Sequence, residues 1–154
     1  SEKKTKIKSI EAFNEDKSSA FPGECIGINL EDPLFVERGE IACHPNENLP
    51  VVKDTLEVNL FWMTKIPLKK GEKTTIKINT QERDCVVGNI TNKLDSSSLE
   101  LIQGNEDELE NTQVAKVQLK MNEPIVFDKF NDIPEMGRVV ITKNGDIAGG
   151  GLIK

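Results

Sequence analysis

Apolar and polar residues alternate along two long stretches of the chain. Residues 55–62 place four apolar side chains on one face and polar side chains on the other, and residues 113–121 repeat the pattern. Because successive side chains of a strand point to opposite faces, this alternation predicts two strands that are each buried on one face. The buried faces are expected to hold Leu56, Val58, Leu60 and Trp62 in the first strand and Ala115, Val117, Leu119 and Met121 in the second.

Shorter apolar segments, separated by turn-forming residues, occupy most of the remaining chain. Pro22-Gly23 and Asn144-Gly145 are two of these turn signals. No window of ten or more residues shows a convincing helical spacing. The shorter predicted strands span residues 5–12, 24–30, 39–43, 73–79, 83–91, 97–102, 137–142 and 146–153. Many short strands with frequent turns predict an all-β fold, either a barrel or a sandwich.

The strand rhythm is interrupted at residues 44–52, where two prolines and two asparagines occur. About three strands are predicted before this segment, which is too few to close a barrel, and about seven after it, which is enough for a closed Greek-key barrel. We therefore expect residues 1–48 to be part of a truncated barrel with unpaired edges and lower stability. Residues 51–154 are expected to form a complete barrel.

Composition narrows the class of protein. The 154 residues are 36% hydrophobic, which is sufficient for a packed core, and the net charge of −6 argues against a protein that coats nucleic acid. No apolar run approaches the ~20 residues of a membrane helix, and no signal peptide is apparent. We therefore expect no membrane association and a cytoplasmic location. The three widely spaced cysteines are predicted to be buried free thiols.

Several short motifs accompany these predicted strands. Residues 20–30 read AFPGECIGINL, residues 35–43 read FVERGEIAC, and farther on come Glu123-Pro124-Ile125 and Gly137-Arg138. Together they resemble the second and third domains of GTPases of the elongation factor Tu superfamily, over nearly the whole chain. The resemblance implies an all-β fold with a partial domain 2-type β-barrel at 1–48 and a Greek-key β-barrel of the domain 3 type at 51–154.

One branch of this superfamily matches more closely. Residues 59–63 read NLFWM and are followed by Pro67-Leu68, a combination most similar to the GTPase subunit of sulfate adenylyltransferase. Ser98-Leu99-Glu100 is comparable with the N-x-L-E of that branch, with serine in place of asparagine. The resemblance implies sulfate activation, in which a separate catalytic subunit makes adenylyl sulfate and these barrels are its non-catalytic docking platform. GTP and magnesium are expected in a GTPase domain that this sequence lacks, and that domain is itself an expected partner.

Two other functions stay open. The chain could be a tRNA-binding barrel module of an elongation factor Tu/1-alpha-like translation factor, which uses both barrels to hold aminoacyl-tRNA. It could also be a stand-alone barrel that serves as an interaction domain. The net charge of −6 and the NLFWM segment favour the sulfate branch, whereas a salt-dependent affinity for tRNA would favour the translation factor.

Residues 92–95, Asn-Lys-Leu-Asp, imitate the guanine-reading N-K-x-D motif of GTPases. The chain has no glycine-rich phosphate loop of the G-x-x-x-x-G-K-[ST] type, which GTP binding would also require. Asn92 and Asp95 are therefore interpreted as ordinary turn residues of a barrel. The chain alone is expected neither to bind nor to hydrolyse GTP.

Cysteine and histidine residues could in number supply zinc ligands, but their spacing matches no zinc module. No Cys-x-x-Cys pair exists, and Cys43 and His44 are adjacent on a strand end, so that they point apart. His44, the only histidine, has no motif that places a nucleophile beside it. Cys25, Cys43, His44 and Cys85 are therefore interpreted as buried thiols and a surface imidazole, and we predict no catalytic, cofactor-binding or metal-binding residue.

Trp62 shares the parity of three aliphatic residues and is predicted inside the barrel, with its indole N–H hydrogen-bonded. Phe61 and Met63 then face outward and could cover the seam between barrels or contact a partner. The lysine-rich segment 65–77 could bind nucleic acid, or it could protect an edge from strand pairing. Arg138 is either a packing or partner residue or a plain surface arginine. The candidate partner-binding residues are thus Phe61, Met63, Lys65, Lys69, Lys70 and Arg138.

Two further segments carry expectations. The acidic stretch Glu106–Glu110 is predicted to be a solvated loop, with a subunit contact as the alternative. The run Gly149-Gly150-Gly151 leaves no side chains where another backbone or a partner must approach closely.

Overall fold

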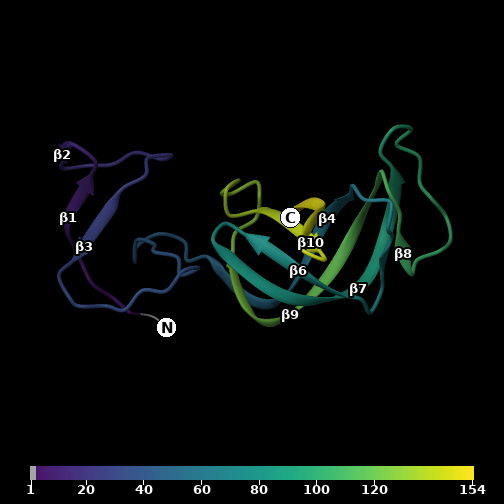
Figure 1. Ribbon diagram of the computed structural model, residues 1–154, viewed down its shortest axis with the longest axis horizontal. Coiled ribbons are helices and arrows are strands. Elements are labelled where there is room, and N and C mark those ends of the chain that lie inside the picture. The colour runs from purple at the N-terminus through teal and green to yellow at the C-terminus, as the bar shows by residue number, and fades with distance from the viewer. Residues whose placement is uncertain (1–2) are drawn as a thin grey trace. The chain divides into compact units, whose positions relative to one another are not determined.

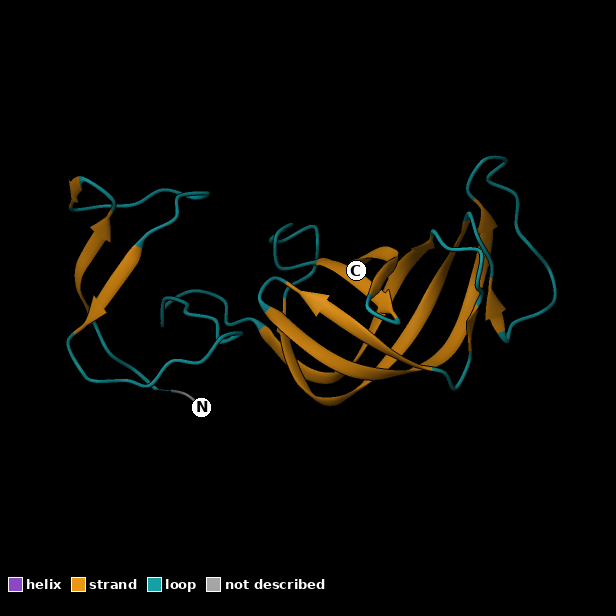
Figure 2. Ribbon diagram, viewed as in Figure 1, coloured by secondary structure: helices purple, strands orange, loops and turns teal. Residues whose placement is uncertain are grey.

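The computed structural model describes residues 3–154, which form strands, turns and loops and contain no helix (Figure 2). The chain divides into two compact units, Ser1–Glu37 and Arg38–Lys154, and each is described by itself. The all-β prediction is confirmed. The strands are β1 (Ile7–Ala12), β2 (Glu15–Lys17), β3 (Gly27–Leu30), β4 (Val51–Trp62), β5 (Leu68–Lys69), β6 (Lys73–Ile78), β7 (Gln81–Asp95), β8 (Glu108–Leu109), β9 (Gln113–Phe127), β10 (Arg138–Lys143) and β11 (Asp146–Ile153).

Among residues 3–154, no helix is long and apolar enough to cross a membrane.

The N-terminal unit is a three-stranded antiparallel sheet in which β1 lies between β2 and β3. Ile10 of β1 pairs with Ile28 of β3 and with Lys17 of β2. None of the described residues 3–37 is buried, and Ile28 is 43% exposed. This sheet therefore has apolar side chains but encloses no core of its own within these residues.

The second unit is a closed antiparallel barrel with the strand order β10-β11-β4-β9-β7-β6 (Figure 1). Strand β4 lies between β9 and β11, so the chain crosses between strands that are distant in sequence, as expected for a Greek-key barrel. Strands β5 and β8 pair outside the barrel as a short two-stranded ribbon. The predicted barrel of 51–154 begins with β4 at Val51.

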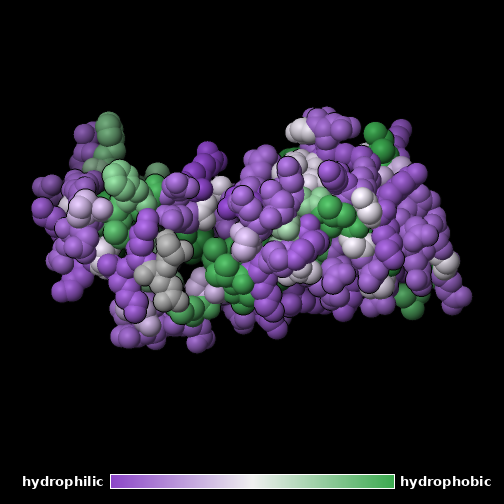
Figure 3. Space-filling model, turned by 90° about the horizontal axis from the view of Figure 1, so that it is seen from below, coloured by the Kyte–Doolittle hydropathy of each residue, from purple (hydrophilic) through white to green (hydrophobic). Residues whose placement is uncertain are grey.

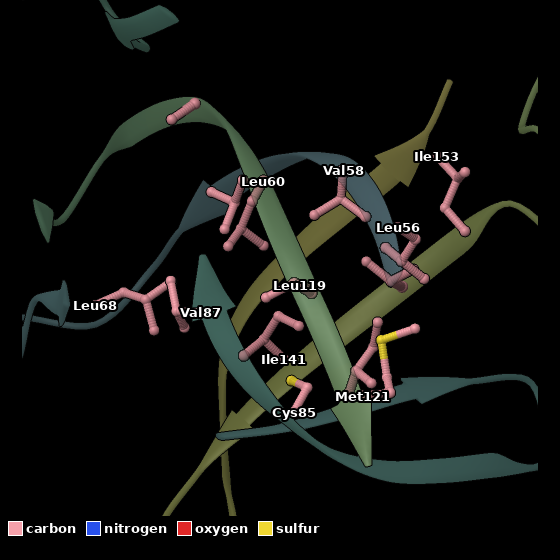
Figure 4. Close-up of a cluster of buried hydrophobic side chains, with 14 of the residues drawn as sticks. Leu56, Val58, Leu60, Leu68, Cys85, Val87, Leu119, Met121, Ile141 and Ile153 are labelled. Carbon is pink, nitrogen blue, oxygen red and sulfur yellow. The ribbon is translucent and has the colours of Figure 1, made fainter. Parts of the chain in front are cut away.

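The alternating residues of β4 and β9 form the barrel core, as their sequence pattern predicts. Figure 4 shows their side chains converging between the strands, together with residues of β7, β10 and β11. Closure of the barrel lets every strand bury its inward face, so each inward aliphatic residue contributes hydrophobic free energy. The inward residues Leu56, Val58, Leu60 and Trp62 of β4 and Ala115, Val117, Leu119 and Met121 of β9 are all 5% exposed or less.

Two predicted strands are wrong. Residues 39–43 form no strand, and the segment begins with Gly39 at a φ of +103°, outside the extended region. Residues 97–102 contribute only an isolated bridge, between Leu101 and Leu94. A turn at Ser96–Ser98 and a left-handed φ of +60° at Leu99 interrupt the extended backbone there.

Three observed strands were not predicted, and others are longer than predicted. Strands β2, β5 and β8 are two or three residues long, which is too short to show a period. Strand β9 continues to Phe127 through Pro124, because its pairing with β4 is interrupted there: Thr55 pairs with Lys120 and Lys53 with Ile125. Proline lacks an N–H and is tolerated in a strand at such an irregularity.

The cysteine prediction is partly wrong. Cys85 is buried on β7, but Cys25 and Cys43 are exposed. Both lie in segments that contribute nothing to the barrel core, so no apolar layer covers them.

Candidate docking face of the barrel

The end of β4 separates an inward tryptophan from two outward apolar side chains. Trp62 is fully buried, and its Nε1 donates a hydrogen bond to the carbonyl oxygen of Ile66 at 2.8 Å. Phe61 is 37% exposed and Met63 is 46% exposed. The predicted burial of Trp62 and the outward placement of its two neighbours are confirmed. A contact of Phe61 or Met63 with a partner stays a prediction.

The three glycines of β11 have different neighbours. A Cβ on Gly149 would lie 2.9 Å from the Phe61 carbonyl oxygen and 2.9 Å from Trp62 Cε3, and a Cβ on Gly151 would lie 2.8 Å from the Asn59 carbonyl oxygen. The close backbone approach expected for these glycines is therefore made by β4 of the same barrel. Gly150 faces outward, and its nearest neighbour would be 3.9 Å away.

The outward position of Gly150 leaves a gap between the side chains of two adjacent strands. Gly150 pairs with Phe61 of β4 on one side and with Val140 of β10 on the other. Because Gly150 has no side chain, both neighbours keep part of their surface open to solvent. We call the exposed or half-buried residues on and beside these three strands the apolar face, which consists of Phe61, Met63, Val140, Ile147 and Leu152.

Other hydrophobic residues are also exposed, among them Phe13, Phe35 and Ile66. On the side of the molecule shown in Figure 3, green residues reach the surface in several separate patches among hydrophilic ones. A contiguous exposed apolar patch indicates an interaction site more strongly than scattered residues do. Within the apolar face, Phe61 and Val140 flank Gly150 across the ladders of β4, β11 and β10.

Arg138 lies at the start of β10, beside the apolar face. Its guanidinium carbon is 5.4 Å from the centre of the Phe130 ring, in a cation–π contact. The Phe130 N–H in turn donates to the Ile153 carbonyl oxygen at 2.9 Å, which fixes the loop before β10 on the barrel. A Cβ on Gly137 would lie 2.3 Å from the Phe130 backbone, so only glycine fits there. The sequence places Gly137 beside Arg138, but its packing role was not predicted.

Two of the predicted partner-binding lysines, Lys69 and Lys70, lie near the C-terminal end of β10, whereas Arg138 lies at its N-terminal end. Lys69 belongs to the β5–β8 ribbon, and the Lys70 N–H donates to the Asp107 carbonyl oxygen at 2.8 Å. This ribbon is near the C-terminal end of β10, because Lys143 Nζ donates to the Pro67 carbonyl oxygen and lies 2.6 Å from a Glu72 carboxylate oxygen. Arg138 stands at the opposite end of the strand, which at about 3.4 Å per residue is roughly 17 Å long.

The six predicted partner-binding residues therefore fall into two groups. Phe61, Met63 and Arg138 belong to or border the apolar face, whereas Lys69 lies in the ribbon and Lys70 directly follows it. Lys65 is exposed in the turn that follows β4. The six residues therefore do not lie on a single surface.

The Asn-Lys-Leu-Asp segment has structural contacts that do not fit guanine. The Lys93 side chain is buried, and its Nζ donates to the carbonyl oxygens of Asn105 and Glu108, so it fixes the acidic loop from inside. Asp95 Oδ1 accepts hydrogen bonds from the N–H groups of Ser98 and Ser97, both at 2.9 Å. These bonds lower the pKa of the Asp95 carboxyl below its usual value. The interpretation of Asp95 as a turn residue agrees with this geometry.

The burial of Lys93 was not predicted, since no feature of the sequence distinguishes it from the exposed lysines. The loop that it holds is not uniformly solvated, because Leu109 of β8 is fully buried. The prediction of a wholly solvated loop at Glu106–Glu110 is therefore wrong at this one position. Among residues 3–154, no group of three or more His, Cys, Asp or Glu side chains is arranged to hold a metal ion.

Comparison with known proteins gives the family. Residues 55–154 match the family described as GTP-eEF1A C-terminal domain-like. Sulfate adenylyltransferase subunit 1 of Tolumonas auensis is 29% identical over 139 residues, which are 90% of this chain and 29% of that protein. Elongation factor 1-alpha of Saccharolobus solfataricus is 30% identical over 151 residues, which are 96% of this chain and 34% of that protein.

A solved structure shares the fold. The crystal structure of sup35 complexed with GDP has a TM-score of 0.83 and 16% sequence identity, and the match covers 97% of this chain and 37% of that one. The chain thus spans about a third of the length of these relatives. From the match over residues 55–154, the chain belongs to the GTP-eEF1A C-terminal domain-like family.

Proposed function

We propose that the chain is the non-catalytic barrel portion of the GTPase subunit of a sulfate adenylyltransferase and that it docks on the catalytic subunit. GTP and magnesium would be bound elsewhere in the parent protein, by a GTPase domain. The similarity to sulfate adenylyltransferase subunit 1 of Tolumonas auensis and of Alteromonas mediterranea supports this assignment. The net charge of −6 also favours a protein partner over RNA.

The observation that carries the docking role is the apolar face. In a closed barrel, an outward aromatic residue gains nothing from the barrel core, yet Phe61 and Met63 both remain on the outside. The glycine at position 150 keeps the Phe61 ring accessible. Apolar anchors of this kind, rather than rim charges, carry most of the binding free energy in protein interfaces.

The test is the affinity of the chain for the catalytic subunit of sulfate adenylyltransferase from the same organism, measured by titration calorimetry. Phe61→Asp is expected to weaken binding by about tenfold or more, as loss of an interface anchor does. Val86→Asp is the matched control, because Val86 is 39% exposed on the outer face of β7. Equal affinities of both variants, or no binding by the unmodified chain, would contradict the proposal.

A second candidate function is tRNA binding by a translation-factor barrel. Elongation factor 1-alpha of Methanopyrus kandleri is 28% identical over 151 residues, so the relatives alone do not decide. Lys65, Lys69 and Lys70 form the exposed basic group that this function would use. For this function, the logarithm of the tRNA binding constant should fall linearly with the logarithm of the salt concentration. The double variant Lys69→Glu, Lys70→Glu should abolish the binding. Both results together would favour this function over the first.

A further inference from the structure

Two adjoining hollows lie on the surface of the barrel, the first over β6, β10 and β11 and the second at the β6–β7 hairpin. The first, of about 560 Å³, has Val140, Ile147, Glu135 and Arg138 in its wall. The second, of about 440 Å³, has Arg38, Glu82 and Arg83 in its wall. Lys77 and Asn79 line both, so the two hollows adjoin, and we call them together the groove, with an apolar part and a polar part.

The charge of this groove opposes that of the chain. Its wall carries four basic side chains and two acidic ones, a local charge of 4 − 2 = +2, in a chain whose net charge is −6. Lys77 Nζ lies 3.2 Å from a Glu82 carboxylate oxygen, so this basic group and this acidic group offset each other and the local charge stays at +2. The groove therefore attracts an anionic occupant while most of the remaining surface repels one.

Two of the arginines are held in place and retain donors for an occupant. Arg138 packs its guanidinium against the Phe130 ring, which fixes the group without using its N–H donors. Arg83 Nη1 donates to the Glu82 carbonyl oxygen at 2.9 Å, whereas its buried Nε lacks a hydrogen-bond partner and has only a carboxylate oxygen of Glu123 at 3.4 Å. A guanidinium fixed in this way loses little side-chain entropy when it binds a carboxylate.

The apolar part of the groove decides which class of anion fits. Ile147 is 66% exposed, and Val140 of the neighbouring strand lies beside it in the wall. A nucleic acid backbone offers phosphates but no aliphatic side chain for this wall. An extended peptide can place an aliphatic side chain against Ile147 and carboxylates against Arg138 of the same hollow and Arg83 of the adjoining one.

We propose that this groove binds an extended acidic segment of a partner protein, with one aliphatic residue seated against Val140 and Ile147 and flanking carboxylates on Arg138 and Arg83. The inference holds for any parent protein, because it depends only on the groove. The groove shares Val140 and Ile147 with the apolar face, but the Phe61 side chain, on which the proposed docking test rests, is not part of the groove wall.

The experiment uses fluorescence anisotropy with a labelled peptide in which a central leucine is flanked by glutamates and aspartates. Saturable binding is expected, and Arg138→Glu should weaken it about tenfold, as should Arg83→Glu. Lys53→Glu is the matched control, since it makes the same charge change on the exposed surface of β4, outside the groove. Ile147→Ser and a peptide with serine in place of leucine should each weaken binding several-fold.

Amide chemical shifts of the unmodified chain provide a readout that does not depend on any variant folding. The peptide is expected to shift the amides of Val140, Ile147 and Lys77, and to leave those of residues 113–119 in the first half of β9 unchanged. If Arg138→Glu and Lys53→Glu lost affinity equally, the binding would be explained by general charge attraction, and the proposal would be wrong. Absence of saturable binding would also contradict it. So would a tRNA that binds through Arg138 more tightly than the peptide does.

Discussion

The N-terminal unit and the barrel are both antiparallel sheets, but they differ in what their strands enclose. In the barrel, six strands close on themselves and bury a continuous cluster of hydrophobic side chains. In the N-terminal unit, three strands form an open sheet, and none of residues 3–37 is buried. Strand pairing therefore does not by itself give a core, since the hydrophobic contribution depends on a second layer or on closure.

The first way to test this comparison is the reactivity of the cysteines, where the largest effect is expected. Burial raises the pKa of the Cys85 thiol to about 12, with the Asp84 carboxylate adding to the shift, while Cys25 is exposed in the N-terminal unit. Since only the thiolate reacts, Cys85 should be alkylated at least about a thousandfold more slowly than Cys25 in the native state. Mass spectrometry after iodoacetamide labelling measures both rates; comparable rates would show that the barrel core opens readily.

The barrel should depend on Trp62 more than on any outward residue. Trp62→Ala is expected to lower the free energy of unfolding by about 3–5 kcal/mol, because it leaves a cavity in a closed core. Phe61→Ala, one residue away but on the outer face, should cost at most about 1 kcal/mol. Urea unfolding followed by circular dichroism measures both variants. If the two losses were equal, the inward and outward faces of β4 would not differ in the way described.

The glycines of β11 give a smaller and more local effect. Gly149→Ala and Gly151→Ala should each destabilise the barrel by about 1–3 kcal/mol, since the added methyl group would meet the backbone of β4. Gly150→Ala, at the outward position between them, should be within about 0.5 kcal/mol of the unmodified chain. Thermal unfolding of the three variants is the measurement, and a large loss for Gly150→Ala would contradict the assigned orientation.

Asp95 gives the smallest expected effect, which is confined to acid conditions. The Ser98 and Ser97 amides lower the pKa of its carboxyl, so its contribution to stability is present above the ordinary aspartate pKa and is lost as the pH falls through the lowered value. Asp95→Asn should therefore be less stable than the unmodified chain at neutral pH, and the difference should shrink at low pH. Asp146→Asn, at an exposed carboxylate of the β10–β11 hairpin, is the control.

The sequence predicts the long strands of the barrel better than the short ones. The alternation in β4 and β9 predicts the core and the burial of Trp62, because many residues of one period define a face. Strands β5 and β8 have two residues each and carry no period, so only the folded barrel positions them. The strand predicted at 97–102 is wrong because the Asp95-capped turn and Leu99 redirect the backbone.

The candidate sites could be predicted only in part. The outward placement of Phe61 and Met63 follows from the parity of β4. The groove over β6 and β10 could not be foreseen, because its residues are far apart in sequence and meet only through the register of the barrel. The burial of Lys93 likewise depends on the loop carbonyls that surround its ammonium group, and no local pattern marks those carbonyls.

The most direct test of the comparison is native-state amide hydrogen exchange, measured on the monomer. Amides of β9 are expected to exchange only by global unfolding, whereas those of β1 should open with a free energy at least about 2 kcal/mol lower, because no buried layer stabilises their sheet. Protection of Ile7–Ala12 equal to that of Gln113–Phe127 would contradict the claim that only the barrel has a core of its own.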